Sequence, residues 1–181
     1  MSASATSQWS HELEAAIVHA VAAHNKHANS PDDAVRFHDR KTPYVVHPIW
    51  CATSLLSEPA LPEELRRNGA IALLWHDTLE DTRLPLPSWS SEKVSSLVAE
   101  MTFESFQQEI DHLWERSEEA KLLKLYDKVS NLLDGSWMKT PKWNAYIVHT
   151  LKLAEHVQSR WGILNIVRIA HTLCIPRQET A

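Results

Sequence analysis

Residues 72–82, ALLWHDTLEDT, place a histidine and three carboxylates directly behind an apolar run. On a continuous helix His76 and Glu80 share one face at a spacing of four residues, and so do Asp77 and Asp81. Carboxylates are disfavoured at the negative, carboxyl end of a helix, so a compensating positive charge is expected. Histidine with aspartate is a mixed nitrogen and oxygen donor set, which suits Mn²⁺, Fe²⁺, Co²⁺ or Zn²⁺ rather than Ca²⁺. The pattern therefore indicates a divalent metal, with further ligands from elsewhere in the chain.

Two other segments offer those ligands. His47 lies in TPYVVHP, at the expected start of a helix whose backbone is fixed by Pro48. Asp127 lies in KLYDKVSN, in the middle of an otherwise apolar helix face. Because an unpaired buried carboxylate is costly, Asp127 needs a cationic partner.

The elements that must position these residues are all expected to be helices, because apolar residues recur at helical spacing along most of the chain. The polar segment 25–43, which contains two prolines, is expected to be a long loop. Ser117 is expected to cap a helix that Gly135 ends. No run of alternating strands is found, so the predicted fold class is all-α. The expected helices span about 8–27, 47–57, 63–82, 92–102, 104–116, 118–134 and 141–174, the last being one helix or a bent pair.

Composition narrows the class of protein. A chain of 181 residues is expected to form a single domain, 1–181. Its net charge of −5 argues against a nucleic-acid or membrane-surface partner, since both need basic patches. Three glycines are too few for a phosphate-binding glycine-rich loop, and two cysteines do not indicate a disulfide framework. With no secretory signal and no span-length apolar run, a cytoplasmic protein is expected.

Three motifs in order carry a family resemblance: TPYVVHP, then ALLWHDTLEDT, then KLLKLYDKVSNLLD. Together they resemble the HD-domain metal-dependent phosphohydrolases, and most closely the stand-alone small alarmone hydrolases related to the hydrolase domain of RelA/SpoT-type enzymes. The motif core covers about residues 10–135, and the helical segment at about 141–174 has no assigned counterpart. No synthetase domain is expected.

The resemblance implies an HD-domain helical bundle and a set of roles. Mn²⁺, or another divalent transition metal, would be held by His47, His76, Asp77 and Asp127. Glu80 and Asp81 would orient or deprotonate the attacking water. The reaction implied is removal of the 3′-pyrophosphate of (p)ppGpp or (p)ppApp, giving pyrophosphate and the nucleoside 5′-di- or triphosphate. The chemistry of the residues agrees, since a metal lowers the pKa of bound water and a carboxylate accepts its proton.

The resemblance also implies substrate contacts. Asn131 would hold the ribose or a phosphate. Arg40 and Lys41, just before the TPYVVHP motif, would contact the base. Arg36 lies in the same loop and is an alternative to Arg40. Leu133 stands where the family commonly has arginine, so guanine and adenine alarmones both remain open. The oligomeric state is also open.

Two alternative functions remain at this point. One is another HD nucleotide phosphohydrolase, such as a 5′-nucleotidase, and the other is a non-catalytic nucleotide-binding regulator. The remaining histidines, among them His24 and His149, are expected to be ordinary core or surface residues.

Overall fold

Helices dominate residues 3–177, which are the residues described by the computed structural model. Within this range the only β-type pairs are two isolated bridges, Ala28–Thr82 and Val35–Pro43. The all-α prediction is therefore confirmed. The α-helices are α1 (Ala3–Lys26), α2 (Val46–Leu56), α3 (Glu63–Trp75), α4 (Thr78–Asp81), α5 (Glu92–Met101), α6 (Phe106–His112), α7 (Glu118–Leu133), α8 (Thr140–Trp161) and α9 (Asn165–Leu173), with 3₁₀ turns η1 (Pro31–Ala34), η2 (Leu113–Glu115) and η3 (Gly135–Trp137).

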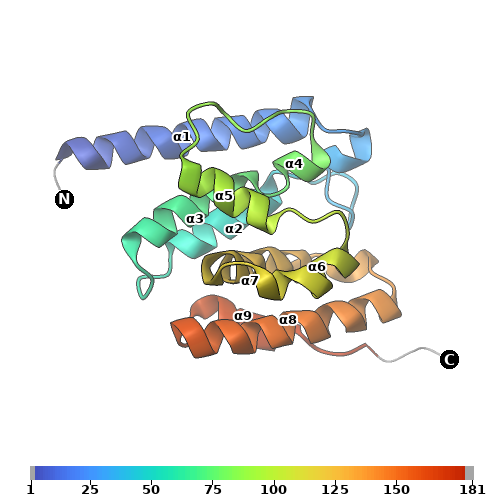
Figure 1. Ribbon diagram of the computed structural model, residues 1–181. Coiled ribbons are helices and arrows are strands. Elements are labelled where there is room, and N and C mark those ends of the chain that lie inside the picture. The colour runs from blue at the N-terminus through green and yellow to red at the C-terminus, as the bar shows by residue number, and fades with distance from the viewer. Residues whose placement is uncertain (1–2, 178–181) are drawn as a thin grey trace.

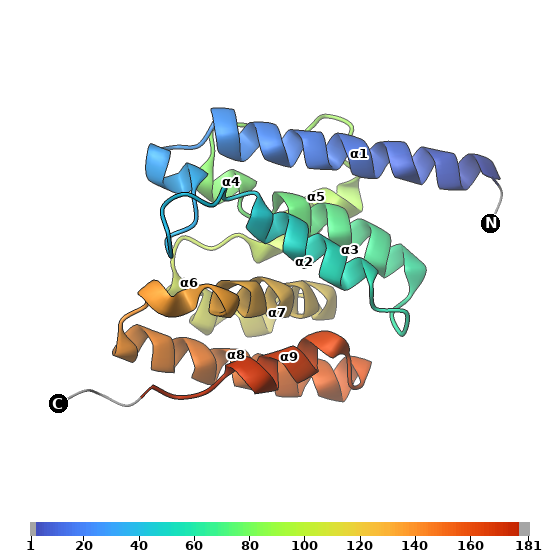
Figure 2. The same ribbon diagram turned by 180° about the vertical axis from the view of Figure 1, so that it is seen from behind.

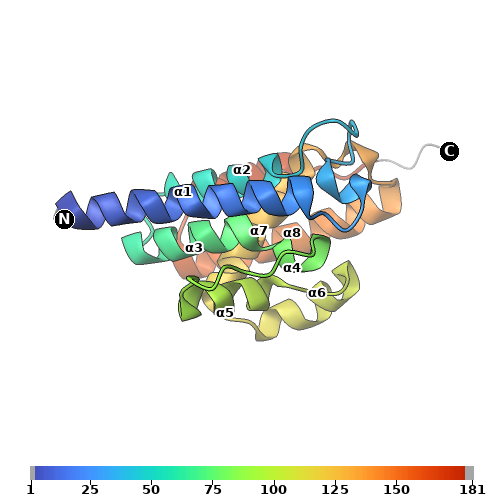
Figure 3. The same ribbon diagram turned by 90° about the horizontal axis from the view of Figure 1, so that it is seen from above.

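The helices stack in layers (Figure 1). The long helix α1 lies along one side, where it contacts α3 and α4, while α8 and α9 lie on the opposite side, as the reverse view also shows (Figure 2). Helix α7 lies between these layers and contacts α2, α3, α5, α8 and α9. Seen from above, α1 runs across α2 and α3 (Figure 3).

The central position of α7 follows from its sequence. Every residue from 120 to 130 is buried, which is expected of a helix enclosed on all sides. The predicted cap at Ser117 is confirmed, because its side chain accepts a hydrogen bond of 3.2 Å from the backbone N–H of Ala120. The chain thus places Asp127 at the centre of the molecule.

Close packing fixes α2 and α3 against α7 and α1. At Gly69 an added Cβ would lie 2.7 Å from Cδ2 of Leu55 and 2.9 Å from Cδ2 of Leu123, so only glycine fits without a shift. Trp75 is fully buried, and its indole N–H donates a 3.1 Å hydrogen bond to the carbonyl of Ala16 on α1. These contacts hold the end of α3, from which His76 follows.

The prediction of one helix over 63–82 is wrong. Helix α3 ends at Trp75, and Asp77, with φ −92° and ψ −3°, leaves the helical path before α4 begins at Thr78. The ring of His76 donates to the carbonyl of Leu73 at 2.8 Å. In a continuous helix that carbonyl would accept from residue 77, so the His76 side chain competes with the helix.

The C-terminal segment is a bent pair rather than one helix. Gly162 separates α8 from α9 with φ +83°, a conformation that favours glycine. Among the described residues, no helix combines the length and apolar character needed to cross a membrane.

Candidate active site

A cavity of about 250 Å³ opens where the loop before α2, the turn between α3 and α4, and helices α6 and α7 meet. It is lined by most of the residues singled out for chemistry in the sequence: Asp77, Glu80, Asp81, Asp127 and Asn131. The break between α3 and α4 makes this arrangement feasible, because it turns residues 76–81 toward α7.

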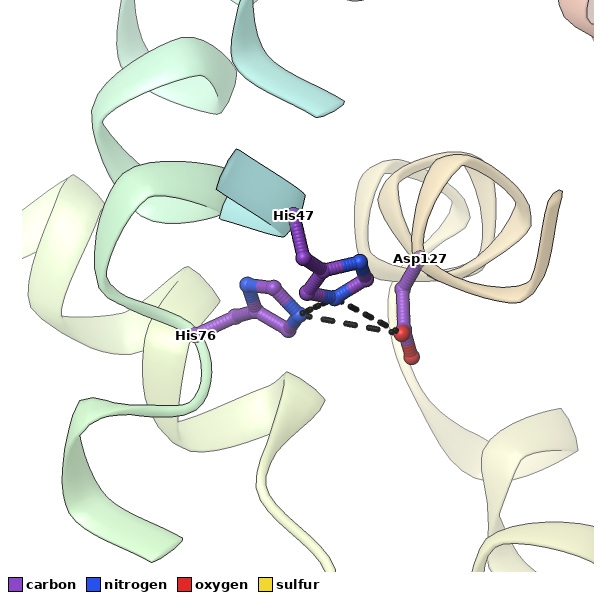
Figure 4. Close-up of side chains that lie close together, drawn as sticks. All are labelled: His47, His76 and Asp127. Carbon is purple, nitrogen blue, oxygen red and sulfur yellow. Dashed lines mark hydrogen bonds and ion pairs between the residues drawn. The ribbon is translucent and has the colours of Figure 1, made fainter. Parts of the chain in front are cut away.

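His47, His76 and Asp127 converge on one point from three elements (Figure 4). The Nε2 atoms of the two histidines are 3.2 Å apart. Oδ1 of Asp127 lies 3.5 Å from Nε2 of His47 and 3.7 Å from Nε2 of His76. All three residues are buried. One ion could reach all three atoms, because they lie within 4.8 Å of one another.

The other ring nitrogens fix which atoms face this point. Nδ1 of His76 donates to the Leu73 carbonyl, which leaves a lone pair on its Nε2. Nδ1 of His47 lies 2.8 Å from the hydroxyl of Ser130, and when it donates there its Nε2 also carries a lone pair. Two lone pairs and a carboxylate oxygen then face one another, so the donor set fits a transition-metal cation.

Asp77 approaches the same point from the turn after α3. Its Oδ2 lies 3.1 Å from Nε2 of His76 and 3.4 Å from Nε2 of His47, and it accepts a 2.7 Å hydrogen bond from the hydroxyl of Tyr44. All four residues predicted as ligands therefore gather in one place, and their roles in metal binding remain a prediction.

The pKa values of the two histidines show how strongly the site attracts positive charge. Burial lowers the pKa of His76, but Asp77 and Asp127 outweigh burial and raise it to about 10. For His47 burial again lowers the pKa, and neighbouring Cys51, Asp127 and Asp77 raise it well above its usual value. The carboxylates thus favour a cation at this point, whether a proton or a metal.

Glu80 and Asp81 lie beside this group on α4. Burial, followed by the charge of Asp77, raises the pKa of Glu80 to about 7. The same two causes raise the pKa of Asp81 to about 7. Oε1 of Glu80 accepts a 2.9 Å hydrogen bond from the backbone N–H of Phe103, which fixes its orientation. A carboxylate with a pKa near neutrality is suited to accept a proton from water.

Of the predicted substrate contacts, Asn131 lines the cavity, and so does Arg36, the alternative to Arg40. The amide of Asn131 donates to Oδ1 of Asp127 at 2.6 Å and accepts from Arg36 at 2.8 Å. Arg36 is buried, lines the cavity and forms a two-pronged ion pair with Asp134 at 2.7 and 2.8 Å.

Arg40 and Lys41 lie outside the cavity lining. Arg40 is exposed, has φ +56° and pairs with Asp32 at 3.1 Å. Its guanidinium stands 4.5 Å from the ring centre of Phe37, which does line the cavity. Lys41 is exposed. A contact of either residue with the base could therefore form only at the mouth of the cavity.

Several residues that line the cavity were not predicted from the sequence. Lys124 and Lys128 flank Asp127 on α7 and are both buried, and Glu109 reaches in from α6. Phe37 and Trp137 are about 40% exposed at the mouth, with ring centres 4.9 Å apart. The signal for Lys124 was its position, since a residue three before an inward-facing aspartate lies on the same face of the helix, and Lys128 lies four residues after Lys124.

The chain is similar in sequence to one group of known proteins. It is 33% identical over 104 residues to the guanosine-3′,5′-bis(diphosphate) 3′-pyrophosphohydrolase MESH1 of Xenopus tropicalis, over 52% of this chain and 56% of that protein. The MESH1 proteins of Mus musculus (32% over 117 residues, 59% and 64%) and Danio rerio (34% over 114 residues, 58% and 62%) are similar to the same degree. The matches thus span about six-tenths of the length of these relatives. No model of a known protein family matches the chain.

A solved structure has the same fold. It belongs to a metazoan ortholog of SpoT that hydrolyses ppGpp and plays a role in starvation responses, and it matches with a TM-score of 0.67 and 23% identity. The match covers 89% of this chain and 92% of the other. The predicted resemblance to alarmone hydrolases is confirmed by the sequence relatives, and the predicted helical fold is confirmed by the solved structure.

Proposed function

We propose that this chain is a metal-dependent phosphohydrolase that removes the 3′-pyrophosphate of purine alarmones. The convergence of His47, His76 and Asp127 beside two carboxyl groups with pKa values near 7 is the observation that carries this proposal. It is supported by similarity to proteins named as guanosine-3′,5′-bis(diphosphate) 3′-pyrophosphohydrolases. We further propose that residues 1–181 form one hydrolase domain that acts in the cytoplasm.

The metal proposed is Mn²⁺, held by His47, His76, Asp77 and Asp127. When bound, it would supply a Lewis acid that polarises a phosphoryl oxygen and acidifies water. The outer contacts support this role, because Ser130, Leu73 and Tyr44 each hold one proposed ligand in orientation.

Glu80 is proposed as the base that takes the proton of the attacking water. Its hydrogen bond from Phe103 leaves Oε2 for the water, and its raised pKa matches the task at neutral pH. Asp81, whose pKa is also raised to about 7, would orient the same water.

The size of the cavity decides which part of the substrate enters. At 250 Å³ it is smaller than the roughly 300–1,000 Å³ of pockets that enclose a drug-sized ligand. We therefore place the 3′-phosphoryl groups inside and the nucleoside at the mouth. There Phe37 and Trp137 present aromatic faces to the base, with Arg40 behind Phe37, and Asn131 holds the ribose or a phosphate.

The bond to be broken joins the ribose 3′-oxygen to phosphorus. Water adds to that phosphorus, the ribose oxygen leaves and takes up a proton, and the pyrophosphate departs intact. The products are then the nucleoside 5′-diphosphate from ppGpp or ppApp, and the 5′-triphosphate from the pentaphosphates.

A substrate panel tests the proposal. Purified protein is incubated with Mn²⁺, and separately with Zn²⁺ or a chelator, and is offered ppGpp, ppApp, nucleoside monophosphates and a generic phosphodiester. The reaction is run in water labelled with heavy oxygen, and mass spectrometry locates the label. Intact labelled pyrophosphate from an alarmone supports the proposal. Orthophosphate from monophosphates would indicate a 5′-nucleotidase instead, and binding without turnover would indicate a regulator.

A further inference from the structure

Lys124 and Lys128 are two buried cations beside the proposed metal site. They lie one turn apart on α7, on either side of Asp127, and only 4% and 5% of their surfaces are exposed. Both line the cavity that holds Glu80 and Asp81. Burying an ammonium group has a high desolvation free energy, so each lysine needs acidic partners or a ligand that offsets it.

Their acidic partners are Asp127 and Glu109. Nζ of Lys124 lies 3.0 Å from Oδ2 of Asp127 and 3.4 Å from Oε2 of Glu109. Nζ of Lys128 lies 2.6 Å from the same oxygen of Glu109 and 3.4 Å from Oδ2 of Asp127. The other oxygen of Glu109 is 3.1 Å from Nε2 of His149 on α8. Two ammonium groups thus share two carboxylates.

Asp127 divides its charge between two sides. Its Oδ1 faces the two histidines, while its Oδ2 faces the lysines. A divalent cation at Oδ1 would draw on the charge of Asp127, and Glu109 would then be the main carboxylate partner of the two ammonium groups. The wall of the cavity would therefore carry excess positive charge in the metal-bound enzyme.

Lys124 is the better placed of the two to contact a substrate. Lys128 is tied most closely to Glu109, and its ammonium also stands 4.9 Å from the ring centre of Tyr146. The contacts of Lys124, 3.0 Å to Asp127 and 3.4 Å to Glu109, are both longer than the 2.6 Å contact of Lys128 to Glu109, and they use two of its three N–H donors. Its ammonium stands 5.4 Å from the ring centre of Phe103, the residue whose backbone N–H holds Glu80. Lys124 therefore lies between Asp127, a proposed metal ligand, and Glu80, the proposed base.

We propose that Lys124 is a catalytic residue whose ammonium group binds non-bridging oxygens of the phosphoryl group under attack, with Asp127 holding it in place. This inference rests on the proposed function for the identity of the substrate. Negative charge on those oxygens must be stabilised in the transition state of phosphoryl transfer, and a fixed, dehydrated cation does this well. Lys124 needs no proton transfer for this role.

The test compares Lys124→Met with Lys121→Met. Lys121 is a matched control: it lies one turn earlier on the same helix, is 7% exposed and pairs with Glu118 at 2.8 Å, away from the cavity. Binding of inorganic phosphate to the Mn²⁺-loaded protein is measured by calorimetry, and Mn²⁺ affinity by electron paramagnetic resonance of the free ion. Lys124→Met should weaken phosphate binding by about tenfold or more, the usual cost of a charge-assisted hydrogen bond, with Mn²⁺ affinity little changed. Lys121→Met should leave both affinities near those of the wild type.

Glu109→Gln provides a test in the opposite direction. It removes the charge that competes for both lysines, so phosphate should bind more tightly, whereas a merely damaged structure would bind it less tightly. This variant decides the question if Lys124→Met fails to fold. Unchanged phosphate binding in Lys124→Met, or unchanged or weaker binding in Glu109→Gln, would overturn the inference. A loss of Mn²⁺ affinity in Lys124→Met as large as its loss of phosphate affinity would reduce Lys124 to a counter-ion of Asp127.

The inference and the proposed function fail separately. If the wild type binds phosphate through Lys124 but cleaves no alarmone, the proposed function is wrong and the phosphoryl site remains. If the wild type cleaves ppGpp and Lys124→Met binds phosphate normally, the proposed function remains and the role of Lys124 is wrong.

Discussion

At the scale of single residues, Asp127 links the proposed metal site to the fold. Because Asp127 is an inward-facing carboxylate on an apolar helix face, the sequence indicated that it needs a cationic partner. The sequence did not reveal that two buried lysines share that carboxylate with the histidines. The lysines lie on the same helix as Asp127, but their second carboxylate partner, Glu109, comes from α6, and the spacing along one helix does not contain that information.

Asp127→Ala is expected to abolish stoichiometric Mn²⁺ binding and turnover. It should also destabilise the metal-free protein by about 3–5 kcal/mol, because Lys124 and Lys128 lose one of their two carboxylate partners. Elemental analysis and thermal unfolding measure the two effects. Asp111→Ala serves as the control, since Asp111 is exposed on α6. Stoichiometric Mn²⁺ at unchanged affinity in Asp127→Ala would remove Asp127 from the ligand set.

Glu80→Gln is expected to lower turnover by roughly 10²–10⁴-fold while Mn²⁺ and substrate still bind, because glutamine cannot take a proton. In the wild type, activity should rise as the pH increases through about 7, where Glu80 loses its proton. The pH–rate profile of the variant should lack that rise. Near-normal turnover in Glu80→Gln would transfer the role of base to Asp81.

The same variant should be more stable than the wild type without metal. The folded state raises the pKa of Glu80 from 4.5 to about 7, so the charged carboxylate destabilises the fold above that range. Glutamine removes this cost, and because Glu80 is partly exposed we expect a gain of about 1–2 kcal/mol at pH 8. The gain should fade below pH 4.5, where the glutamate is protonated in both states. Thermal unfolding of both proteins across this pH range is the measurement, and an equal gain at acid pH would show a cause other than charge.

At the scale of elements, the helices could be predicted from apolar spacing, and the bent pair α8–α9 was among the expected arrangements. The break between α3 and α4 was not predicted, because residues 63–82 keep helical spacing throughout. The break depends on the hydrogen bond that the His76 side chain donates to the Leu73 carbonyl and on the hydrogen bond from Tyr44 to Asp77. Asp77, Glu80 and Asp81 do line one cavity with Asp127, but they reach it through the turn after α3 and not along one face of a continuous helix.

Packing of α3 against α2 and α7 sets the separation of His76 and His47. In Gly69→Ala the new Cβ would meet Leu55 and Leu123 at under 3 Å, which should cost about 1–3 kcal/mol of stability and weaken Mn²⁺ binding as α3 shifts. Gly162→Ala is the matched control, because its cost comes from φ +83° with no atom within 4 Å. It should lose stability without losing Mn²⁺ affinity. Equal Mn²⁺ affinity in the two variants would show that the α2–α3 packing does not position the ligands.

At the scale of the whole molecule, the proposed ligands come from three separate parts of the chain: the start of α2, the turn after α3 and the middle of α7. A metal that binds all of them can bind only the folded chain, so its binding free energy adds to the free energy of unfolding. The start of α2, the turn after α3 and the middle of α7 would then be held together by one ion as well as by the core.

Mn²⁺ at 100 times its dissociation constant should stabilise the fold by about 2.7 kcal/mol. For a chain of this size that corresponds to a rise in Tm of roughly 5–10 °C. Thermal unfolding with increasing Mn²⁺ measures the effect, and Mg²⁺ should give less, because it binds nitrogen ligands poorly. The rise should disappear in His76→Ala, where the ion loses a ligand between α3 and α4, and persist in His11→Ala, whose histidine is exposed on α1. An equal rise in wild type and His76→Ala would place the ion elsewhere on the protein, and the proposed site would then have to be abandoned even if the enzyme hydrolyses alarmones.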